Sequence, residues 1–387
     1  MYQGVDFYSV NEMFSEEEIM IQQTVRGFVE EKFLPFVSKY HRECYFPAEI
    51  IPELGKLGLL GITVPEEYGG PGLSHFIYGI VMQELERGDT GLRSFASVQG
   101  SLVMYPIYTY GSEEQKKYWL PKLAAGEKIG CFGLTEPDFG SDPGGMITRA
   151  KKVKEGWLLN GTKMWITNGS VADVAVVWAK TDEGVSGFLV ERDRPGFNSR
   201  SIPGKFSLRA SDTGELSFQD CLIPDKNRLP AAKGLKAPLS CLNEARYGIA
   251  WGALGAAMAC YDEALRYAGD RIQFDRPVSG FQLTQQKLVE MITEITKGQL
   301  LAYQLGRLKD SGKAKFYHVS LAKRNNVQKA LEIARSARTI LAANGISDEY
   351  QTIRHMLNLE SVLTYEGTHE IHTLIVGEQL TGQSAFR

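Results

Sequence analysis

Apolar and polar positions follow two different periods along the 387-residue chain, and the period changes twice. In the first third, apolar residues recur three or four positions apart, as at Ile21 and Val25, which predicts a helix with one apolar stripe. Ser15 and Glu18 precede this stripe and form a capping box, because each side chain can bond a backbone amide of the first turn. Further helices are expected over residues 53–60, 76–86 and 113–123. We therefore predict an N-terminal helical domain over residues 1–127.

The segment 128–235 lacks the helical period and contains short runs rich in β-branched and aromatic residues. Asn160-Gly161 interrupts one such run. Because this dipeptide is typical of two-residue hairpin turns, we predict a short strand on either side of it. Further strands are expected over residues 174–179, 187–191 and 216–221, with a turn at 182–184. The prediction for this segment is a small antiparallel β domain.

The helical period returns after Pro238 and continues through the rest of the chain. Three apolar stripes, each with spacings of three or four, predict long helices that pack against one another. The stripes are Leu254, Met258, Tyr261 and Leu265; Leu288, Met291, Ile292 and Ile295; and Val327, Leu331 and Ala334. We predict a C-terminal four-helix bundle over residues 236–387, so the expected fold class is α+β, mainly α.

Composition and charge exclude several classes of partner. The formal net charge is −3, so no overall positive field attracts nucleic acid or an anionic membrane surface. No apolar run approaches the roughly 18 residues needed to cross a bilayer. The N-terminus reaches Glu16, Glu17 and Glu18 before any basic residue, unlike a signal or transit peptide. The five cysteines are scattered without a C-x-x-C pair, which is typical of a reducing compartment, so we expect a cytoplasmic protein without a metal site.

Four motifs bring residues with catalytic and binding chemistry into a fixed order. They are LTEPDFGSD at Leu134–Asp142, NGTKMWITN at Asn160–Asn168, RIQF at Arg271–Phe274 with Gln282, and YEGT at Tyr365–Thr368. Together they resemble the acyl-CoA dehydrogenase family over nearly the whole chain. Segments that are similar to glutaryl-CoA dehydrogenases in particular lie at 97–104, 245–251, 323–326 and 344–350. The resemblance implies helical, β and helical domains in that order, an FAD cofactor and the oxidation of an acyl-CoA thioester.

Oxidation between the α- and β-carbons of a thioester needs a base for the α-proton and an acceptor for the β-hydride. The resemblance places the base at Glu366, and burial beside flavin and acyl chain would raise the pKa of its carboxyl into a useful range. A solvated loop glutamate is the alternative interpretation. Some relatives carry the base just before the arginine that matches Arg246. This chain has Ala245 there, which cannot accept a proton.

The resemblance places FAD between the β domain and the C-terminal bundle. No G-x-G-x-x-G follows a predicted strand, so a Rossmann fold is not expected. The residues expected to contact FAD are Leu134, Thr135, Ser141, Trp165, Thr167, Gly367 and Thr368, with Arg271, Phe274 and Gln282 reaching the FAD of a neighbouring subunit. This implies an obligate homo-oligomer, usually a tetramer. Asp275 replaces a glycine common in the family, and its carboxylate disfavours a nearby pyrophosphate unless Arg276 offsets the charge or the side chain turns to solvent.

The substrate prediction depends on Glu86, Arg93 and Ser94. The distal carboxylate of a five-carbon dicarboxyl thioester must be desolvated, and arginine suits it because the guanidinium is always charged and can bind bidentately. In glutaryl-CoA dehydrogenases the arginine that matches Arg93 performs this task. The alternative is a surface Glu–Arg pair. Other residues expected at the substrate are Ser141, Ser211, Arg246 and Tyr365; Arg246 is also consistent with a core ion pair.

The reaction that this resemblance implies has two stages. Glu366 removes the α-proton while the β-hydride moves to FAD, and the γ-carboxylate of the resulting glutaconyl-CoA then leaves as CO2. Protonated Glu366 returns its proton at the γ-carbon to give crotonyl-CoA, and the electrons pass to electron-transfer flavoprotein. Tyr365 and Glu86 match the pattern of the decarboxylating members.

Other functions stay open on the sequence alone. An acyl-CoA oxidase would keep Glu366 and FAD but normally has an additional C-terminal domain. A dehydrogenase of another dicarboxyl thioester, such as a benzylsuccinyl one, or of a short-chain thioester without decarboxylation differs in pocket volume. A non-catalytic acyl-CoA-binding protein would not need the Glu366 carboxylate. His369 and His372 have no third ligand at metal spacing, so we interpret them as ordinary polar residues.

Overall fold

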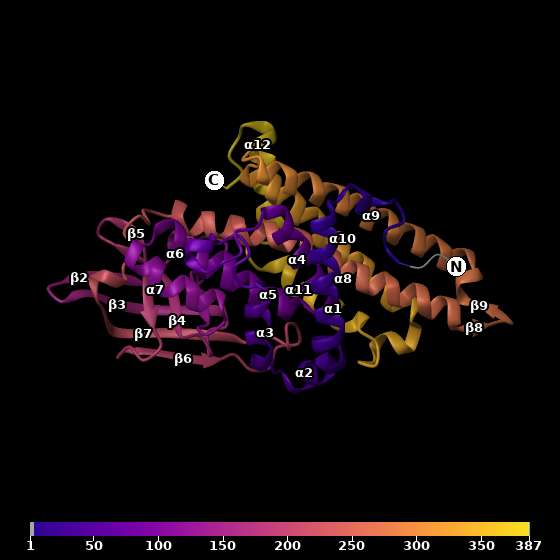
Figure 1. Cartoon of the computed structure of the whole chain (residues 1–387), viewed down its shortest axis with the longest axis horizontal. Coiled ribbons are helices and arrows are strands. Elements are labelled where there is room, and N and C mark those ends of the chain that lie inside the picture. Colours follow the sequence, from indigo (N-terminus) through magenta and orange to yellow (C-terminus); the bar gives the residue numbers. More distant parts are fainter. Residues whose placement is uncertain (1–3, 387) are drawn as a thin grey trace.

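Helices α4 and α5 lie near the centre of the molecule, where α4 packs against both N-terminal and C-terminal helices (Figure 1). The computed structural model describes residues 4–386. The α-helices of this first part are α1 (Glu16–Phe28), α2 (Val37–Glu43), α3 (Ile51–Lys56), α4 (His75–Gly88), α5 (Thr90–Ser97), α6 (Tyr105–Tyr110) and α7 (Glu113–Ala124). A π-helix over Val98–Met104 continues α5. Almost every residue of α4 and α5 is buried, so polar side chains on these helices lie inside the protein.

The capping box at the start of α1 is confirmed. The Ser15 hydroxyl accepts from the Glu18 amide at 3.2 Å, and the Ser15 amide donates to the Glu18 carboxylate at 2.8 Å. The helix predicted over residues 53–60 is only partly right, because α3 covers Ile51–Lys56 and the chain then turns. Gly58 has φ +70° in that turn, a left-handed conformation that glycine adopts without steric cost.

The middle part is a mainly antiparallel sheet in the order β1-β4-β2-β3-β7-β6, with β5 also paired to β4. Its strands are β1 (Gly130–Gly133), β2 (Arg149–Val153), β3 (Gly156–Thr167), β4 (Val174–Thr181), β5 (Gly184–Glu191), β6 (Phe197–Ser201) and β7 (Thr213–Ile223). Two pairings, β1 with β4 and β2 with β4, are parallel. Along β4, Val176 and Trp178 face the core shared with the helices, whereas Val177 and Ala179 face the core of the β domain. Both faces of this strand are therefore buried.

The hairpin predicted at Asn160-Gly161 is wrong. β3 runs unbroken through both residues, and the turn before it joins Val153 to Gly156. Asn160-Gly161 instead marks a shift in the register between β3 and β7, a β-bulge. Gly161 has φ +145°, and the Asn160 side chain bonds Asp220 of β7 through both its oxygen and its nitrogen. The conformational freedom that suits a hairpin turn suits a bulge equally.

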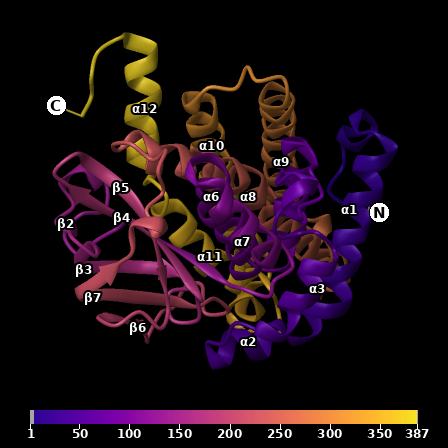
Figure 2. The same cartoon turned by 60° about the vertical axis from the view of Figure 1, so that its left-hand side comes forward.

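The C-terminal part consists of long helices and one protruding hairpin. Its elements are α8 (Lys236–Asp270), β8 (Ile272–Gln273), β9 (Arg276–Pro277), α9 (Gln282–Asp310), α10 (Phe316–Ile340), α11 (Thr352–Thr364) and α12 (His369–Thr381). The predicted apolar stripes are buried, apart from the half-buried Leu265. Figure 2 shows α11 beside the sheet on one side and near α8 and α10 on the other. The α+β, mainly α, fold class is thus confirmed.

Helices α4 and α8 approach each other closely because α8 presents glycines to α4. A Cβ atom at Gly255 would lie 1.9 Å from the Gln83 carbonyl oxygen, and one at Gly252 would lie 2.1 Å from Glu86 Oε2.

The β8–β9 hairpin lies at the opposite end of the longest axis from the sheet (Figure 1). Across residues 4–386, no helix combines the length and the apolar character that crossing a membrane requires.

Candidate active site

The loop between α11 and α12 carries the predicted base. α11 ends at Thr364, and Thr368 caps α12, where its hydroxyl accepts from the Ile371 amide at 3.2 Å. Between them, Glu366 has φ +51° and Gly367 has φ +94°. A left-handed conformation is uncommon for a residue with a side chain and costs about 1–2 kcal/mol, so surrounding contacts must hold Glu366 in place.

The Glu366 carboxylate is buried although the residue as a whole is half-buried. Its Oε2 atom accepts no hydrogen bond from any residue within 4–386. Burial raises the pKa of the Glu366 carboxyl above the usual glutamate value, while the positive charges of Lys323, Arg93 and Arg246 oppose that rise. An unpartnered buried carboxylate with a raised pKa is suited to accept a proton from a bound molecule.

Two cations, the buried Lys323 and the half-buried Arg246, bond to the backbone of this loop. The Lys323 ammonium donates to the carbonyl oxygens of Tyr365 at 2.5 Å, Gly367 at 2.7 Å and Glu366 at 3.4 Å. Arg246 Nε donates to the Glu366 carbonyl oxygen at 2.7 Å. The structure therefore brings Arg246, which is expected at the substrate, next to the backbone of the predicted base.

The predicted substrate residues Glu86 and Arg93 form a buried ion pair beside the same loop. Arg93 Nε donates to Glu86 Oε2 at 2.6 Å, and Arg93 Nη2 donates to the Tyr365 hydroxyl. Glu86 Oε1 accepts from the Thr90 hydroxyl at 2.9 Å. Burial by itself lowers the pKa of Arg93, but Glu86 and Tyr365 raise it above its usual value, so the guanidinium stays charged. The alternative of a surface Glu–Arg pair is wrong, because both side chains are at most 1% exposed.

One nitrogen of Arg93 has no hydrogen-bond partner among the described residues. Nε and Nη2 are used by Glu86 and Tyr365, whereas Nη1 makes no hydrogen bond to any residue between 4 and 386. Gly252 of α8 leaves the space that the pair occupies, since a Cβ there would meet both Glu86 Oε2 and, at 3.2 Å, Arg93 Nε. Arg93 thus combines a buried positive charge with a free donor.

The residues predicted to contact FAD from one subunit lie on the β domain and on the Glu366 loop. Leu134 is buried, Thr135 and Thr167 are half-buried, and Ser141 and Trp165 are exposed. Trp165 is 58% exposed and has φ +63°, an uncommon backbone conformation for a residue with a side chain. A buried lysine, Lys163, fixes the loop before Thr135 by donating to the Leu134 carbonyl at 3.0 Å and to Glu136 at 2.8 Å.

The residues predicted to reach the FAD of a neighbour lie far from these positions. Arg271, Phe274 and Gln282 are exposed at the β8–β9 hairpin and the start of α9, at the opposite end of the molecule from the sheet (Figure 1). Phe274 is 88% exposed. Asp275 is exposed, and Arg276 stacks on Phe281 with its Cζ atom 3.9 Å from the ring centre.

Two further predicted substrate residues, Ser94 and Ser211, are buried, and so is His372, which we interpret as an ordinary polar residue. Ser94 is buried on α5 directly after Arg93. Ser211 is buried in the loop before β7, and its carbonyl oxygen accepts from Lys205 at 2.8 Å. His372 is buried near the carbonyl groups of Glu366 and Gly367, where burial lowers the pKa of its imidazole to about 2, so the ring is neutral. The roles assigned to the site residues from the sequence stay predictions.

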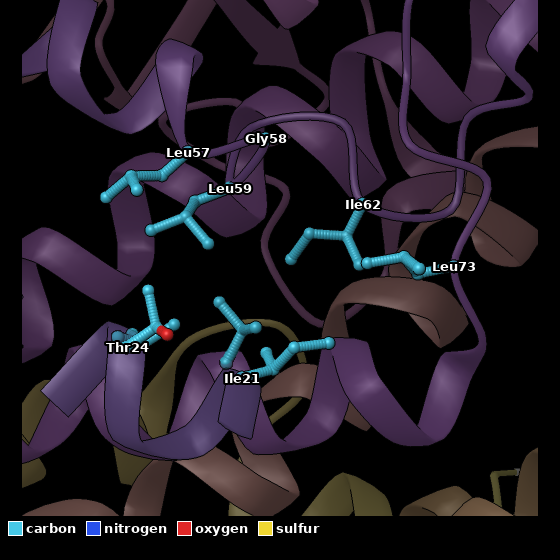
Figure 3. A pocket seen from close by; sticks show the side chains of 9 residues that line it. Ile21, Thr24, Leu57, Gly58, Leu59, Ile62 and Leu73 are labelled. Atoms are coloured by element: carbon cyan, nitrogen blue, oxygen red, sulfur yellow. The ribbon is translucent and has the colours of Figure 1, made fainter. Parts of the chain in front are cut away.

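A small apolar pocket lies outside this site, between α1 and the segment that joins α3 to α4 (Figure 3). It is lined by Ile21, Thr24, Val25, Leu57, Gly58, Leu59, Ile62, Leu73 and Val81. Thr24 supplies its only polar side chain, so the pocket offers no group suited to acid–base chemistry. None of the site residues described above lines this pocket.

Lys323, which has no individual role among the predictions from the sequence, lies at the centre of the site. A signal for it exists in the sequence. Val319, Lys323, Val327 and Leu331 are spaced by four, which puts a lysine on the apolar face of α10. Lysines are almost never fully buried without a specific partner, so a lysine in such a stripe marks a candidate functional position.

Comparisons with known proteins agree with this geometry. The chain matches the acyl-CoA dehydrogenase family in three parts: the N-terminal domain over residues 15–127, the middle domain over 131–221 and the C-terminal domain over 232–381. A human relative, the mitochondrial short-chain specific acyl-CoA dehydrogenase, is 38% identical over 371 residues, which covers 94% of this chain and 90% of the relative.

Two solved structures from Mycobacterium smegmatis match over the full length of both chains. A glutaryl-CoA dehydrogenase is 57% identical, with a TM-score of 0.98 and 100% coverage of each chain. A glutaryl-CoA dehydrogenase in complex with FADH2 is 52% identical, with a TM-score of 0.99 and 100% coverage of each chain.

Proposed function

Because this chain belongs to the acyl-CoA dehydrogenase family, we propose that it converts glutaryl-CoA into crotonyl-CoA and CO2 and passes the electrons to electron-transfer flavoprotein. The chain is an FAD-dependent acyl-CoA dehydrogenase. The dicarboxyl substrate, the decarboxylation and the electron acceptor are the proposal.

The choice of substrate rests on the position and charge of Arg93. Arg93 is a buried cation close to the Glu366 loop, and its Nη1 atom is free of partners within residues 4–386. A thioester held with its α-carbon near Glu366 would direct its far end into the protein, where a carboxylate needs a buried counterion. A monocarboxylic acyl chain has no negative charge at its far end that a buried cation would stabilise. The charge of Arg93 therefore favours a substrate with a distal carboxylate.

The residues present suit an FAD cofactor. The hydroxyls of Thr135, Ser141 and Thr167 make no hydrogen bond within residues 4–386, so they are available to a polar ligand. Trp165 of β3 offers an exposed aromatic ring two residues before Thr167. FAD, when bound, supplies the acceptor for the hydride that leaves the β-carbon. The proton transfers of the reaction are performed by side chains of the protein.

Glu366 performs those proton transfers. Its ionised carboxylate removes the α-proton, and the enclosed position of Oε2 keeps the proton on the carboxyl group rather than releasing it to water. When the carbon–carboxylate bond breaks, its electron pair passes through the double bond toward the thioester. The same proton then adds to the γ-carbon and completes crotonyl-CoA. Glu86 partly neutralises Arg93, which weakens the hold of Arg93 on the carboxylate that must leave as neutral CO2.

The proposal is tested by identifying the products of the purified, FAD-loaded protein. With glutaryl-CoA and an artificial electron acceptor, we expect one CO2 for each crotonyl-CoA, measured by CO2 trapping and mass spectrometry. Glutaconyl-CoA without CO2 would retain the dicarboxyl substrate but refute the decarboxylation. Oxidation of butyryl-CoA with no reaction of glutaryl-CoA would favour the short-chain activity named for the human relative.

The electron acceptor is tested with the same substrate. We expect reduced enzyme to be reoxidised faster by electron-transfer flavoprotein than by dissolved oxygen, as measured by the return of flavin absorbance. Faster reoxidation by oxygen would indicate an oxidase instead.

We also propose that the chain forms a homo-oligomer, with a tetramer as the expected form. Several large apolar side chains are exposed on the β8–β9 hairpin and α9: Ile272 (53%), Phe274 (88%), Leu283 (74%) and Val289 (61%). Such a patch favours contact with another copy. A second subunit would also bring Arg271, Phe274 and Gln282 to an FAD that they cannot reach within their own chain.

Replacing Leu283 and Val289 by aspartate is therefore expected to produce smaller species that retain less FAD. Sedimentation velocity measures the mass, and the ratio of flavin to protein absorbance measures the FAD content. Met20→Asp changes an exposed apolar residue on α1, 61% exposed, and serves as the matched control that should leave both values unchanged. A wild-type monomer with a full complement of FAD would contradict the proposal.

A further inference from the structure

We propose that Lys323 is a positioning residue, which holds the Glu366 loop in its reactive conformation and supplies the buried positive charge that keeps the Glu366 carboxylate ionised. This inference rests on the assignment of Glu366 as the base. It concerns a residue whose hydrogen bonds all go to backbone carbonyl groups of the loop.

The contacts of Lys323 span the whole turn that carries Glu366. Its ammonium bonds the carbonyl oxygens of Tyr365, Glu366 and Gly367 in succession, at 2.5, 3.4 and 2.7 Å. Three acceptors match the three N–H groups of an ammonium, whereas a neutral amine has only two. This arrangement therefore favours the charged ammonium form of Lys323, although the residue is only 2% exposed.

The loop needs such an anchor because its conformation is unfavourable by itself. Glu366 has a left-handed backbone, and three consecutive carbonyl groups converge on one point. Arg246 adds only one bond, to the Glu366 carbonyl oxygen. Without the lysine, all three carbonyl groups would lose a bond, and only that of Glu366 would keep one, from Arg246. The converging dipoles would then repel one another.

The charge state of the Glu366 carboxyl depends on all the titratable and charged groups that face it. They are Tyr78 of α4, Arg93 of α5, Arg246 of α8, Lys323 of α10, Tyr365 of the loop and His372 of α12. The tyrosines are neutral because burial raises their pKa values, and His372 is neutral because burial lowers its own. Glu86 offsets Arg93.

Of the three cations that face Glu366, Arg93 pairs with Glu86, whereas Arg246 and Lys323 form no ion pair with a carboxylate of the described residues. Of these, Lys323 holds the longer stretch of the loop. Burial lowers the pKa of Lys323 well below the usual lysine value, the negative charge of Glu366 opposes that effect, and the positive charges of Arg246 and Arg93 add to it. Lys323 and Glu366 therefore stabilise each other's charged forms.

Lys323→Met and Lys323→Gln separate the two parts of the role. Both remove the positive charge, so the pKa of Glu366 should rise by about one unit or more. The acid limb of the pH profile of kcat/KM should move upward by the same amount, which makes the loss of activity largest at low pH. Only Gln keeps N–H donors for the carbonyl groups, so it should recover part of the kcat lost in Met. A structural role alone would lower activity equally at every pH.

A second readout needs neither substrate nor turnover. Hydrogen–deuterium exchange of the peptide that covers 362–370 should be about tenfold faster in Lys323→Met than in wild type, and less so in Lys323→Gln. The matched control is Lys309→Met, which removes a lysine of α9 with a 10% exposed side chain that pairs with Glu244 away from the loop. It should change neither the pH profile nor loop exchange.

The outcomes distinguish this inference from the proposed function. Wild-type kinetics, pH profile and exchange in an FAD-loaded Lys323→Met protein would overturn the role of Lys323 even if glutaryl-CoA is the substrate. If wild type fails with glutaryl-CoA, the substrate proposal fails, and the exchange measurement still decides the role of Lys323. If Lys323→Met does not fold, Lys323→Gln decides: an unchanged acid limb would overturn the inference.

Discussion

Replacing Glu366 by glutamine should lower kcat/KM for acyl-CoA oxidation by roughly 10²- to 10⁴-fold, the usual contribution of a general base. Glutamine has nearly the same shape as glutamate, so the loop, the FAD content and thioester binding should change little. The remaining activity should also lose its acid limb. In wild type, burial raises the pKa of Glu366 and only the ionised form accepts a proton, so kcat/KM falls as the pH drops through this raised pKa.

The matched control for this variant is Glu370→Gln. Glu370 lies in the first turn of α12, four residues beyond Glu366, but it is exposed to solvent. Steady-state rates and the pH profile of this variant should equal those of wild type. If Glu366→Gln keeps more than about a tenth of wild-type activity, far above what loss of a general base allows, the base must be another group.

Helical periodicity and capping predict the elements that carry the site, because these signals are local. The capping box of α1 and the stripes of α8, α9 and α10 lie where the sequence pattern places them. Asn160-Gly161 shows the limit of local signals. The dipeptide permits an unusual backbone conformation, and only pairing with β7 decides between a turn and a bulge.

Lys323 shows a different limit. Its place in the apolar stripe of α10 indicates that it is buried, but its partners lie 42 to 44 residues further along the chain. They are backbone carbonyl groups, which every residue has, so no residue type marks them in the sequence. The close approach of Gly252 to Glu86 is also invisible, because it depends on how α4 and α8 cross.

Arg93→Met should change which substrate the enzyme prefers. Glutaryl-CoA without its distal carboxylate is butyryl-CoA, so the ratio of their kcat/KM values isolates the contribution of that carboxylate. Loss of a buried, charged hydrogen-bonding partner costs about 2–5 kcal/mol, which corresponds to a roughly 30- to 4,000-fold fall in the ratio of glutaryl-CoA to butyryl-CoA. Parallel steady-state measurements with the two thioesters give this ratio.

The single variant leaves Glu86 as a buried carboxylate without its arginine, which by itself destabilises the protein. The double variant Glu86→Gln/Arg93→Met removes both charges, so the same fall in the ratio there cannot come from an unpaired Glu86. Arg354→Met/Asp89→Asn is the matched control, because it removes another buried ion pair, with a 2.9 Å bond between α11 and the start of α5. This control can lower both rates but should leave their ratio unchanged. A ratio that stays at the wild-type value in both Arg93 variants would mean that Arg93 only packs against Glu86 and Tyr365, and that the proposed dicarboxyl substrate is wrong.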